Sequence, residues 1–320
     1  MEEIKLYVLK FNSNLIFKIK LLYRPNLFGR IIAIFLFLAC RTTNSEFIKH
    51  LPHHEFQANQ SNLLQPRIEI FTKFQQEPIK KLTFILDTGS NVSLIRNSLY
   101  KAVGDSNKFK LKSISGEIEG DFGEVKLNLF DSSERIIGEN ISFHTFEFDS
   151  RFAFDGLIGN DVLSKFSLFL ELPENVYIIQ PNIKTKKFEG FTKIPFHFAD
   201  GHILVHALIE NRLCKLLLDT GAGISYLNQS KAAELNLKRG GKASFIDLRG
   251  EEQNTFYHIG ENLCVAENLC QKKIELLSGN SIQDFLSKEG NLDGILGMNW
   301  VENYSILIDY QNLELYIKKR

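Results

Sequence analysis

A pattern that occurs twice is the feature that most restricts how this chain can fold. Residues 84–95 read FILDTGSNVSLI and residues 216–227 read LLLDTGAGISYL, so the second DTG follows the first by 132 residues (219 − 87). A second pair follows in the same order, DGLIG at 155–159 and DGILG at 293–297. Repeated patterns of this kind are the sequence signature of a duplicated structural unit. We therefore expect two related halves whose loops differ in length.

Alternation of apolar and polar residues predicts that both halves consist mainly of β-strands, which is an all-β fold class. Each half ends in a pattern typical of a hairpin with one buried face, at 166–180 and at 304–318. A basic, turn-rich stretch at 181–193 is the expected linker between the halves. The strands expected most clearly are Leu82–Leu86, Ile203–Ile209 and Leu213–Leu218. Short helices are expected at Asn97–Val103, Gln229–Leu235 and Ser281–Lys288.

The chemistry of a DTG triplet depends on its being paired. An apolar strand anchors the loop, Gly permits a tight backbone turn, and Thr supplies a hydroxyl that can brace an opposite loop. Two such loops bring two carboxylates together, and adjacent carboxylates share one proton because both cannot ionise cheaply. The ionised group can take a proton from water while the protonated group donates one to a carbonyl oxygen. The plainer alternative is that each DTG is only a strand-ending turn, since Asp and Gly favour turns.

This doubled pattern, DTG followed downstream by two apolar residues and Gly, resembles the aspartic peptidases of the pepsin and retropepsin type over roughly residues 66–320. The resemblance implies that Asp87 and Asp219 are catalytic in an aspartic endopeptidase, which hydrolyses peptide bonds with a water activated between two carboxylates and needs no cofactor. It also implies two similar retropepsin-like β-barrel lobes, 66–183 and 184–320, with a catalytic cleft between them. The residues expected to support the catalytic loops are Thr88, Gly89, Ser90, Thr220, Gly221 and Ala222. The glycines expected in segments packed beneath the loops are Gly159 and Gly297.

The two loops differ directly after the triplet. A hydroxyl at Ser90 can donate to the Asp87 carboxylate, which Ala222 cannot do in the second loop, so our hypothesis is that Asp87 is the ionised partner. A flap is expected in each lobe, at Ser115–Glu124 and at Leu248–Tyr257. An ordinary hairpin with no role in substrate binding is the alternative for both segments.

The sequence alone is compatible with several functions and with two modes of assembly. The leading expectation is an endopeptidase that acts on a polypeptide substrate. One alternative is a catalytically inactive, aspartic-protease-like binding lipoprotein that keeps the fold and the cleft. Another is a narrow processing enzyme with one cognate target. Because one chain carries both DTG loops, a monomer is expected to suffice for the active site, and a homodimer that pairs like lobes is the alternative assembly.

The N-terminal region reads as a targeting segment. Basic residues precede an apolar run, Ile31–Ala39, which ends at Cys40 and is shorter than the roughly 20 residues needed to span a bilayer. The sequence Phe-Leu-Ala-Cys at 37–40 resembles a bacterial lipobox, which implies that residues 1–40 are a signal peptide and that Cys40 is lipidated. A plain signal peptide or short anchor is the alternative. Residues 41–65 are polar and predict a tether, so we expect an exported, membrane-anchored lipoprotein in the periplasm or at the cell surface.

The charge, cysteine and histidine content bears on nucleic-acid binding, disulfide pairing and metal binding. Lys plus Arg and Asp plus Glu both total 38, so no charge imbalance favours nucleic-acid binding. Cys264 and Cys270 can pair in an oxidising compartment, which leaves Cys214 within a strand. His202 and His206 have a spacing that binds metals on a helix, but they lie in an alternating strand and predict no metal site. The acidic residues expected to cap turns are Asp155 and Asp293.

Overall fold

The computed structural model describes residues 5–11, 15–21, 53–57, 65–100, 107–113, 116–172, 174–179, 188, 190–279, 285–286 and 291–320. The chain divides into two compact units, Met1–Ile48 and Lys49–Arg320. In the first unit, β1 (Lys5–Phe11) pairs antiparallel with β2 (Leu15–Leu21). The apolar run that ends at Cys40 lies outside the described residues. No helix within these ranges has the length and apolar character that a membrane crossing requires.

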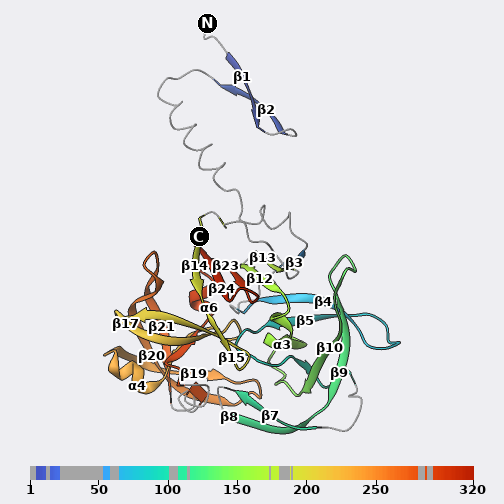
Figure 1. Ribbon diagram of the computed structural model, residues 1–320, viewed down its shortest axis with the longest axis vertical. Helices are drawn as coiled ribbons and strands as arrows, with labels where there is room; N and C mark the ends of the chain where they lie inside the picture. The colour runs from blue at the N-terminus through green and yellow to red at the C-terminus, as the bar shows by residue number, and fades with distance from the viewer. Residues whose placement is uncertain are drawn as a thin grey trace. The chain divides into compact units, whose positions relative to one another are not determined.

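The first half of the second unit forms a closed barrel (Figure 1). Its strands follow the order β10-β6-β11-β5-β4-β9, and pairing of β10 with β9 closes the ring. Alternation drives this arrangement: in β9, Val125, Leu127 and Leu129 are buried in the barrel, and the residues between them are more exposed. The bounds are β4 (Arg67–Lys73), β5 (Lys80–Leu86), β6 (Leu94–Arg96), β9 (Glu124–Phe130), β10 (Ile136–Phe146) and β11 (Gly156–Ile158).

The second half repeats this strand order within an eight-stranded sheet, β15-β16-β17-β22-β18-β21-β20-β19. An additional pairing of β16 with β20 closes six of the strands into the ring β21-β18-β22-β17-β16-β20. Every pair in this ring has the same parallel or antiparallel sense as its counterpart in the first barrel. The all-β class is confirmed, and the sequence repeat corresponds to a repeated topology. The bounds are β15 (His197–Ala199), β16 (His202–Ile209), β17 (Arg212–Leu218), β18 (Ser225–Leu227), β19 (Lys238–Ile246), β20 (Glu252–Ala266), β21 (Leu269–Ser278) and β22 (Gly294–Leu296).

A six-stranded sheet joins the ends of the two halves in the order β14-β24-β23-β12-β13-β3. At its centre β12 of the first half pairs antiparallel with β23 of the second half, from Ser167 opposite Asp309 to Leu170 opposite Ile306. The hairpins expected at 166–180 and 304–318 are therefore confirmed as β12–β13 and β23–β24. The bounds are β3 (His53–Gln57), β12 (Ser167–Glu171), β13 (Asn175–Ile179), β14 (Thr192–Pro195), β23 (Tyr304–Asp309) and β24 (Glu314–Lys319).

Strand β3 corrects the expectation that residues 41–65 form only a tether. It pairs antiparallel with β13 and buries Phe56 and His54, and the Nδ1 atom of His54 lies 2.8 Å from Oδ2 of the buried Asp131. A strand with one apolar side chain facing the core has almost no hydrophobic periodicity, so the sequence gives little signal for it. Residues 192–193 of the expected linker likewise belong to β14.

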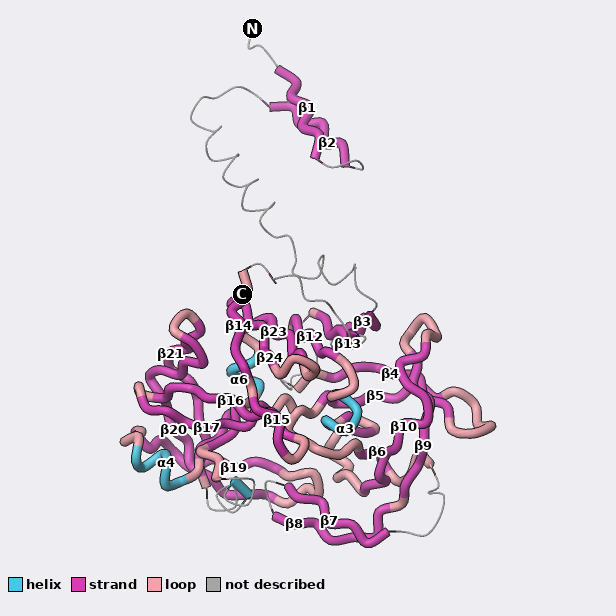
Figure 2. The backbone as a smooth tube through the Cα atoms, viewed as in Figure 1, coloured by secondary structure: helices cyan, strands magenta, loops and turns pink. Residues whose placement is uncertain are grey.

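In the described part of the chain, helices are few and short, as Figure 2 shows. The helix expected at Gln229–Leu235 is confirmed as α4 (Gln229–Glu234), whose N-cap Asn228 accepts a hydrogen bond from the Lys231 N–H at 2.6 Å. The described part of Asn97–Val103 is a turn and not a helix, and most of Ser281–Lys288 lies outside the described residues. Two more short helices among the described residues are α3 (Asn160–Leu163) and α6 (Met298–Val301), one after each DG-apolar-apolar-G pattern.

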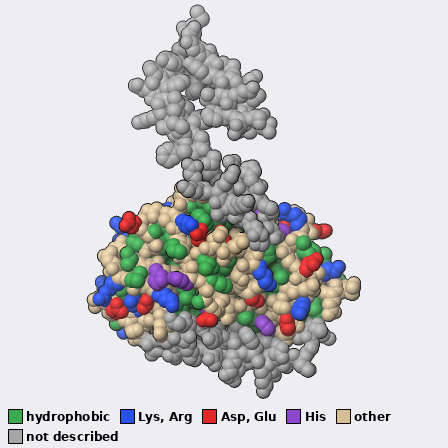
Figure 3. Space-filling view, viewed as in Figure 1, with side chains coloured by type: hydrophobic (Ala, Val, Ile, Leu, Met, Phe, Trp, Pro, Cys, Tyr) green, Lys and Arg blue, Asp and Glu red, His purple; other side chains and the backbone are tan. Residues whose placement is uncertain are grey.

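Charges on the surface are mixed. On the face drawn in Figure 3, basic and acidic side chains are interspersed among apolar and neutral polar ones. This distribution agrees with the balanced totals of 38 basic and 38 acidic residues in the sequence. A patch-free mixture of both signs gives no attraction for one class of charged partner on that face.

Candidate active site

Both DTG loops begin where a buried strand ends. Asp87 follows β5 directly and its N–H donates to the Ile158 carbonyl at 3.0 Å, while Asp219 follows β17 and donates to the Leu296 carbonyl at 3.0 Å. In each half the neighbouring strand, β11 or β22, runs parallel to the strand that carries the aspartate. The two aspartates therefore occupy equivalent positions in the two barrels.

The threonines of the two loops hold the loops together by reciprocal hydrogen bonds. The Thr88 hydroxyl donates to the Leu218 carbonyl at 2.8 Å and accepts from the Thr220 N–H at 3.1 Å. The Thr220 hydroxyl donates to the Leu86 carbonyl at 2.5 Å and accepts from the Thr88 N–H at 3.1 Å. Both threonines are fully buried, so these four bonds satisfy groups that water does not reach. The structure thus brings the two sequence-distant loops into direct contact.

The glycines of the triplets allow each loop to approach the carboxyl group of the other. A Cβ atom on Gly89 would lie 2.2 Å from Cγ of Asp219, and a Cβ atom on Gly221 would lie 2.6 Å from Cγ of Asp87. At such distances any side chain at these two positions would displace the opposite carboxyl group. Each carboxyl group therefore lies against the opposite loop, close enough for the charge of Asp219 to raise the pKa of Asp87.

Burial and proximity shift the acidity of both aspartates. The pKa of Asp87 lies well above its ordinary value because the carboxyl group is desolvated and because the charge of Asp219 is close. The pKa of Asp219 is also raised by burial, but N–H groups of its own loop and the hydrogen bond from Asp87 oppose this shift. Gly221 and Ala222 donate to Asp219 Oδ1 at 2.7 and 3.0 Å. Both pKa values are thus raised, and the N–H groups around Asp219 favour its ionised form.

The structure removes the support for the hypothesis that Asp87 is the ionised partner. The hypothesis required the Ser90 hydroxyl to donate to the Asp87 carboxylate, but that hydroxyl donates to the Val92 carbonyl at 2.7 Å, within its own loop. Asp87 Oδ1 accepts instead from the Gly89 N–H at 2.9 Å. Because Ala222 contributes its backbone N–H, the lack of a side-chain hydroxyl there does not weaken the second loop.

Gly159 and Gly297 lie packed against the DTG loops, as the sequence predicts. A Cβ atom on Gly159 would lie 2.4 Å from the Val92 carbonyl oxygen, and one on Gly297 would lie 2.8 Å from the Ile224 backbone. Their N–H groups donate to the hydroxyls of Ser93 and Ser225, at 3.0 and 2.9 Å respectively. The glycine segments therefore support the loops from behind.

The sequence reasoning missed the side chains that complete this support. Ser93 donates its hydroxyl to Asp161 Oδ1, and Ser225 donates its hydroxyl to Asn299 Oδ1, both at 2.7 Å. The repeat itself could have revealed these residues. Ser93 and Ser225 are 132 residues apart (225 − 93), as the two DTG motifs are, and Asp161 and Asn299 are 138 residues apart (299 − 161), as the two DG-apolar-apolar-G motifs are. A further residue, Asn160, obeys no such register.

Asn160 ties the first loop to the second half of the chain. Its side-chain amide donates to the Thr88 carbonyl at 2.6 Å and to the Gly201 carbonyl at 2.7 Å. The Tyr310 hydroxyl donates to Asn160 Oδ1 at 2.6 Å. The equivalent position in the second half is Met298, so this tie occurs on one side only.

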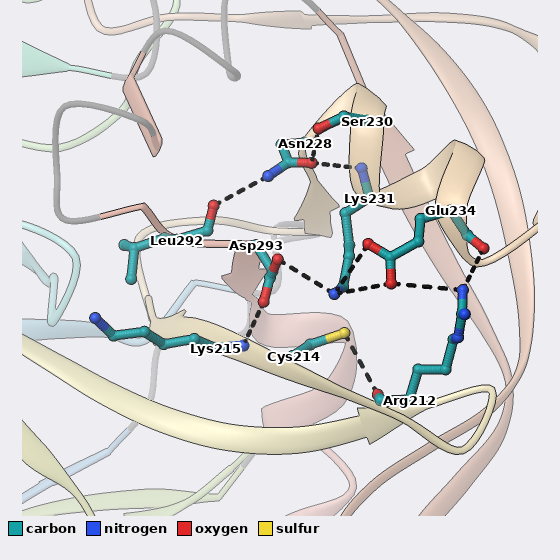
Figure 4. Close-up of polar contacts among 9 residues, drawn as sticks. All are labelled: Arg212, Cys214, Lys215, Asn228, Ser230, Lys231, Glu234, Leu292 and Asp293. Carbon is teal, nitrogen blue, oxygen red and sulfur yellow. Dashed lines mark hydrogen bonds and ion pairs between the residues drawn. The ribbon is translucent and has the colours of Figure 1, made fainter.

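Asp155 and Asp293, which the sequence predicts as turn caps, accept hydrogen bonds from the N–H groups of neighbouring strands. Asp155 accepts from the Thr83 N–H and Asp293 accepts from the Lys215 N–H, each at 2.8 Å, so each fixes the strand that leads into a DTG loop. Figure 4 shows Asp293 between this backbone contact and the Lys231 ammonium group, 3.5 Å away. Each aspartate thus links the start of one strand to its neighbouring strand, β11 to β5 and β22 to β17.

Two apolar clusters lie on the strand faces beside the loops. Ile85 and Leu217 each precede a loop aspartate by two residues and each belongs to one of the clusters. The first cluster is rich in phenylalanine and its buried members are Ile85, Leu94, Phe146, Phe148, Phe154 and Leu157. The second contains Leu204, Leu217, Tyr226, Leu277, Leu292 and Ile295 among its buried members.

The tip of the β19–β20 hairpin contacts the first half of the chain. The Leu248 carbonyl accepts from the Asp149 N–H at 3.1 Å, the Gly250 carbonyl accepts from Arg151 Nη2 at 2.5 Å, and the Leu248 side chain packs against the first apolar cluster. The segment expected as the second flap thus reaches across to the opposite half. Tyr257, on the same hairpin, has its pKa raised to about 12 by a hydrogen bond to Glu275.

The other expected flap falls on the hairpin of β7 (Asn107–Ser113) and β8 (Gly116–Phe122), whose side chains lie outside the described residues. The expected pairing of Cys264 with Cys270 is confirmed as a disulfide, and Cys214 is a buried free thiol in β17. Within the described part of the chain, no three His, Cys, Asp or Glu side chains are grouped so that they hold a metal.

Comparison with known proteins adds no relative. No protein-family model matches the chain, and no curated protein matches it.

Proposed function

We propose that this protein is an aspartic endopeptidase of the pepsin and retropepsin type, built from two retropepsin-like β-barrel lobes of one chain. The observation that supports this most is the reciprocal contact of the two DTG loops, in which each threonine braces the opposite loop and each glycine packs against the opposite carboxyl group. The repeated strand order of the two barrels supports the lobe assignment.

In the proposed reaction a water molecule binds between Asp87 and Asp219, and the peptide lies in a cleft between the lobes. Asp219, as the carboxylate, takes a proton from the water, whose oxygen attacks the scissile carbonyl carbon. Asp87, as the acid, donates its proton to the carbonyl oxygen, so the tetrahedral intermediate forms without a covalent enzyme adduct. Asp219 then gives the proton that it took to the leaving nitrogen, while one hydroxyl of the intermediate returns a proton to Asp87. The C–N bond breaks, and the pair regains its starting state. Burial raises the pKa of both groups, which favours retention of the shared proton.

Both loops belong to one chain, and β12 and β23 join the halves in one sheet, which supports a monomer that is sufficient for catalysis. We further propose that the protein is exported and attached to a membrane through a lipid on Cys40. Replacement of Cys40 with Ser tests this attachment: the lipoprotein account expects the variant to leave the membrane fraction and to lose the added lipid mass at its N-terminus.

The test of the proposed activity is cleavage of a peptide library by the full chain from pH 3 to pH 8, read by mass spectrometry. Asp87→Asn and Asp219→Asn keep the shape of each carboxyl group and remove its acid–base chemistry. We expect cleavage by the wild type and its loss in both variants. Binding of peptides without cleavage by any of the three proteins would favour the inactive binding protein instead.

A further inference from the structure

Arg67, the first residue of β4, is a buried cation with incomplete hydrogen bonding. Only 4% of its surface is exposed, and its Nη1 donates to the Ala153 carbonyl at 3.3 Å while the guanidinium lies 5.8 Å from the Phe154 ring centroid. Its Nε and Nη2 atoms are buried and have no hydrogen-bond partner among the described residues. Buried donors without acceptors are costly, and arginine does not relieve the cost by losing its proton.

The register of the strands places Arg67 beside the end of β5 that leads into the Asp87 loop. Arg67 lies directly opposite Ile85 in the β4–β5 ladder, so both side chains project from one face, and Asp87 follows Ile85 by two residues. Gln65 precedes Arg67 by two residues, and its side-chain amide donates to the Gly221 carbonyl in the Asp219 loop at 2.7 Å. The segment 65–67 therefore runs beside both catalytic loops.

The fold does not require a cation at this position. In the second barrel the residue opposite Leu217, the counterpart of Ile85, is Leu204, which is buried in the second apolar cluster. The two barrels thus share topology, but one has leucine where the other has arginine. No ion pair of Arg67 occurs within the described ranges, and burial lowers the pKa of its guanidinium. The second barrel thus avoids the free-energy cost of a buried cation with unpaired donors. Because the first barrel bears this cost at Arg67, we infer that Arg67 has a role in binding.

We propose that Arg67 binds the carboxylate of a glutamate or aspartate side chain of the substrate, on the first-lobe side of the scissile bond, and so gives the enzyme a preference for acidic residues there. Nε and Nη2 share one edge of the guanidinium plane and form the fork that matches the two oxygens of a carboxylate. The phenylalanine-rich cluster beside Arg67 excludes water, which strengthens such a pair. The inference rests on the proposed peptidase activity and adds its substrate class.

Matched peptides that differ only by Glu or Gln at one position, scanned along a substrate that the enzyme cleaves, test the proposal. We expect the wild type to cleave the Glu peptide with a kcat/KM about ten- to hundredfold higher at one position. Arg67→Leu, which copies Leu204 of the second barrel, should bring this ratio to about one with little change for the Gln peptide. Arg67→Lys should keep part of the preference. Arg135→Met, whose arginine already pairs with Asp131, should leave the ratio as in the wild type.

A wild-type ratio near one at every position overturns the proposal, as does a ratio that survives in Arg67→Leu. Removal of an unpaired buried charge should leave the melting temperature of Arg67→Leu at or above that of the wild type, which separates loss of preference from loss of folding. If the wild type cleaves no peptide, the proposed function fails on its own. The carboxylate site is then tested by binding of the same Glu and Gln peptides to the wild type and to Arg67→Leu, where equal affinities of the wild type for both peptides reject it.

Discussion

The close approach of Gly221 to Asp87 gives a sharp test of how the two loops depend on each other. In Gly221→Ala the new Cβ atom would lie 2.6 Å from Asp87 Cγ, 2.6 Å from Oδ1 and 2.7 Å from Oδ2. Ordinary carbon contacts need about 3.5 Å or more, so Asp87 must move by roughly 1 Å. A misplacement of about 1 Å in an active site costs on the order of 100-fold in rate, and overpacking costs about 1–3 kcal/mol of stability.

Gly223→Ala is the matched control, because it lies in the same loop and a Cβ atom there meets nothing within 4 Å. We expect Gly221→Ala to lower kcat/KM by about 100-fold or more and to lower the melting temperature by roughly 2–10 °C. Gly223→Ala should match the wild type closely in both measurements. Equal behaviour of the two variants, in peptide cleavage and in thermal melting, would refute the reasoning that the glycine of one loop sets the position of the opposite carboxyl group.

Three further predictions concern stability. Because folding raises the pKa of Asp87, the folded state keeps a proton that the unfolded state loses above about pH 4, and stability falls as the pH rises through the folded pKa. Asp87→Asn should therefore gain melting temperature relative to the wild type on going from pH 3 to pH 7, and a gain that does not grow with pH contradicts the shift. Thr88→Val leaves the Leu218 carbonyl and the Thr220 N–H without their buried partner, so urea denaturation should show a loss of about 2–4 kcal/mol that Thr88→Ser largely avoids. Replacing Cys264 and Cys270 together with Ala should cost about 2 kcal/mol, as the short loop between them implies, with no added effect of a reductant on the variant.

The parts of the fold that the sequence predicts are those encoded by local pattern. Alternation in segments such as β9 predicts strands, because each residue's exposure depends on its own position in the pleat. The doubled DTG and DG-apolar-apolar-G patterns predict the paired loops and the glycines beneath them, since only glycine fits such close backbone contacts. Because Asp87 and Asp219 occupy equivalent positions in the two repeats, the sequence also indicates that these two residues form the pair.

The parts that the sequence does not predict arise from contacts between distant segments or from choices within a loop. Tyr310 meets Asn160 across 150 residues (310 − 160), and no periodicity links the two positions. The Ser90 hydroxyl has two acceptors within reach of a turn, and the geometry of its loop selects the Val92 carbonyl over the Asp87 carboxylate. Strand β3 forms because a buried aspartate and an open sheet edge hold it, although its own sequence carries little apolar signal.

One measurement addresses the shared proton of the carboxyl pair without any substrate. Carbon-13 NMR of aspartate carboxyl carbons, followed from pH 3 to pH 8 in the wild type, Asp87→Asn and Asp219→Asn, counts the protons that the pair retains. We expect one carboxyl signal to titrate far later than the other aspartates. This late titration should be lost in Asp87→Asn and should occur at a lower pH in Asp219→Asn, because there the charge of Asp219 is gone while the burial of Asp87 remains. Titration of every aspartate near pH 4 in the wild type would contradict the account.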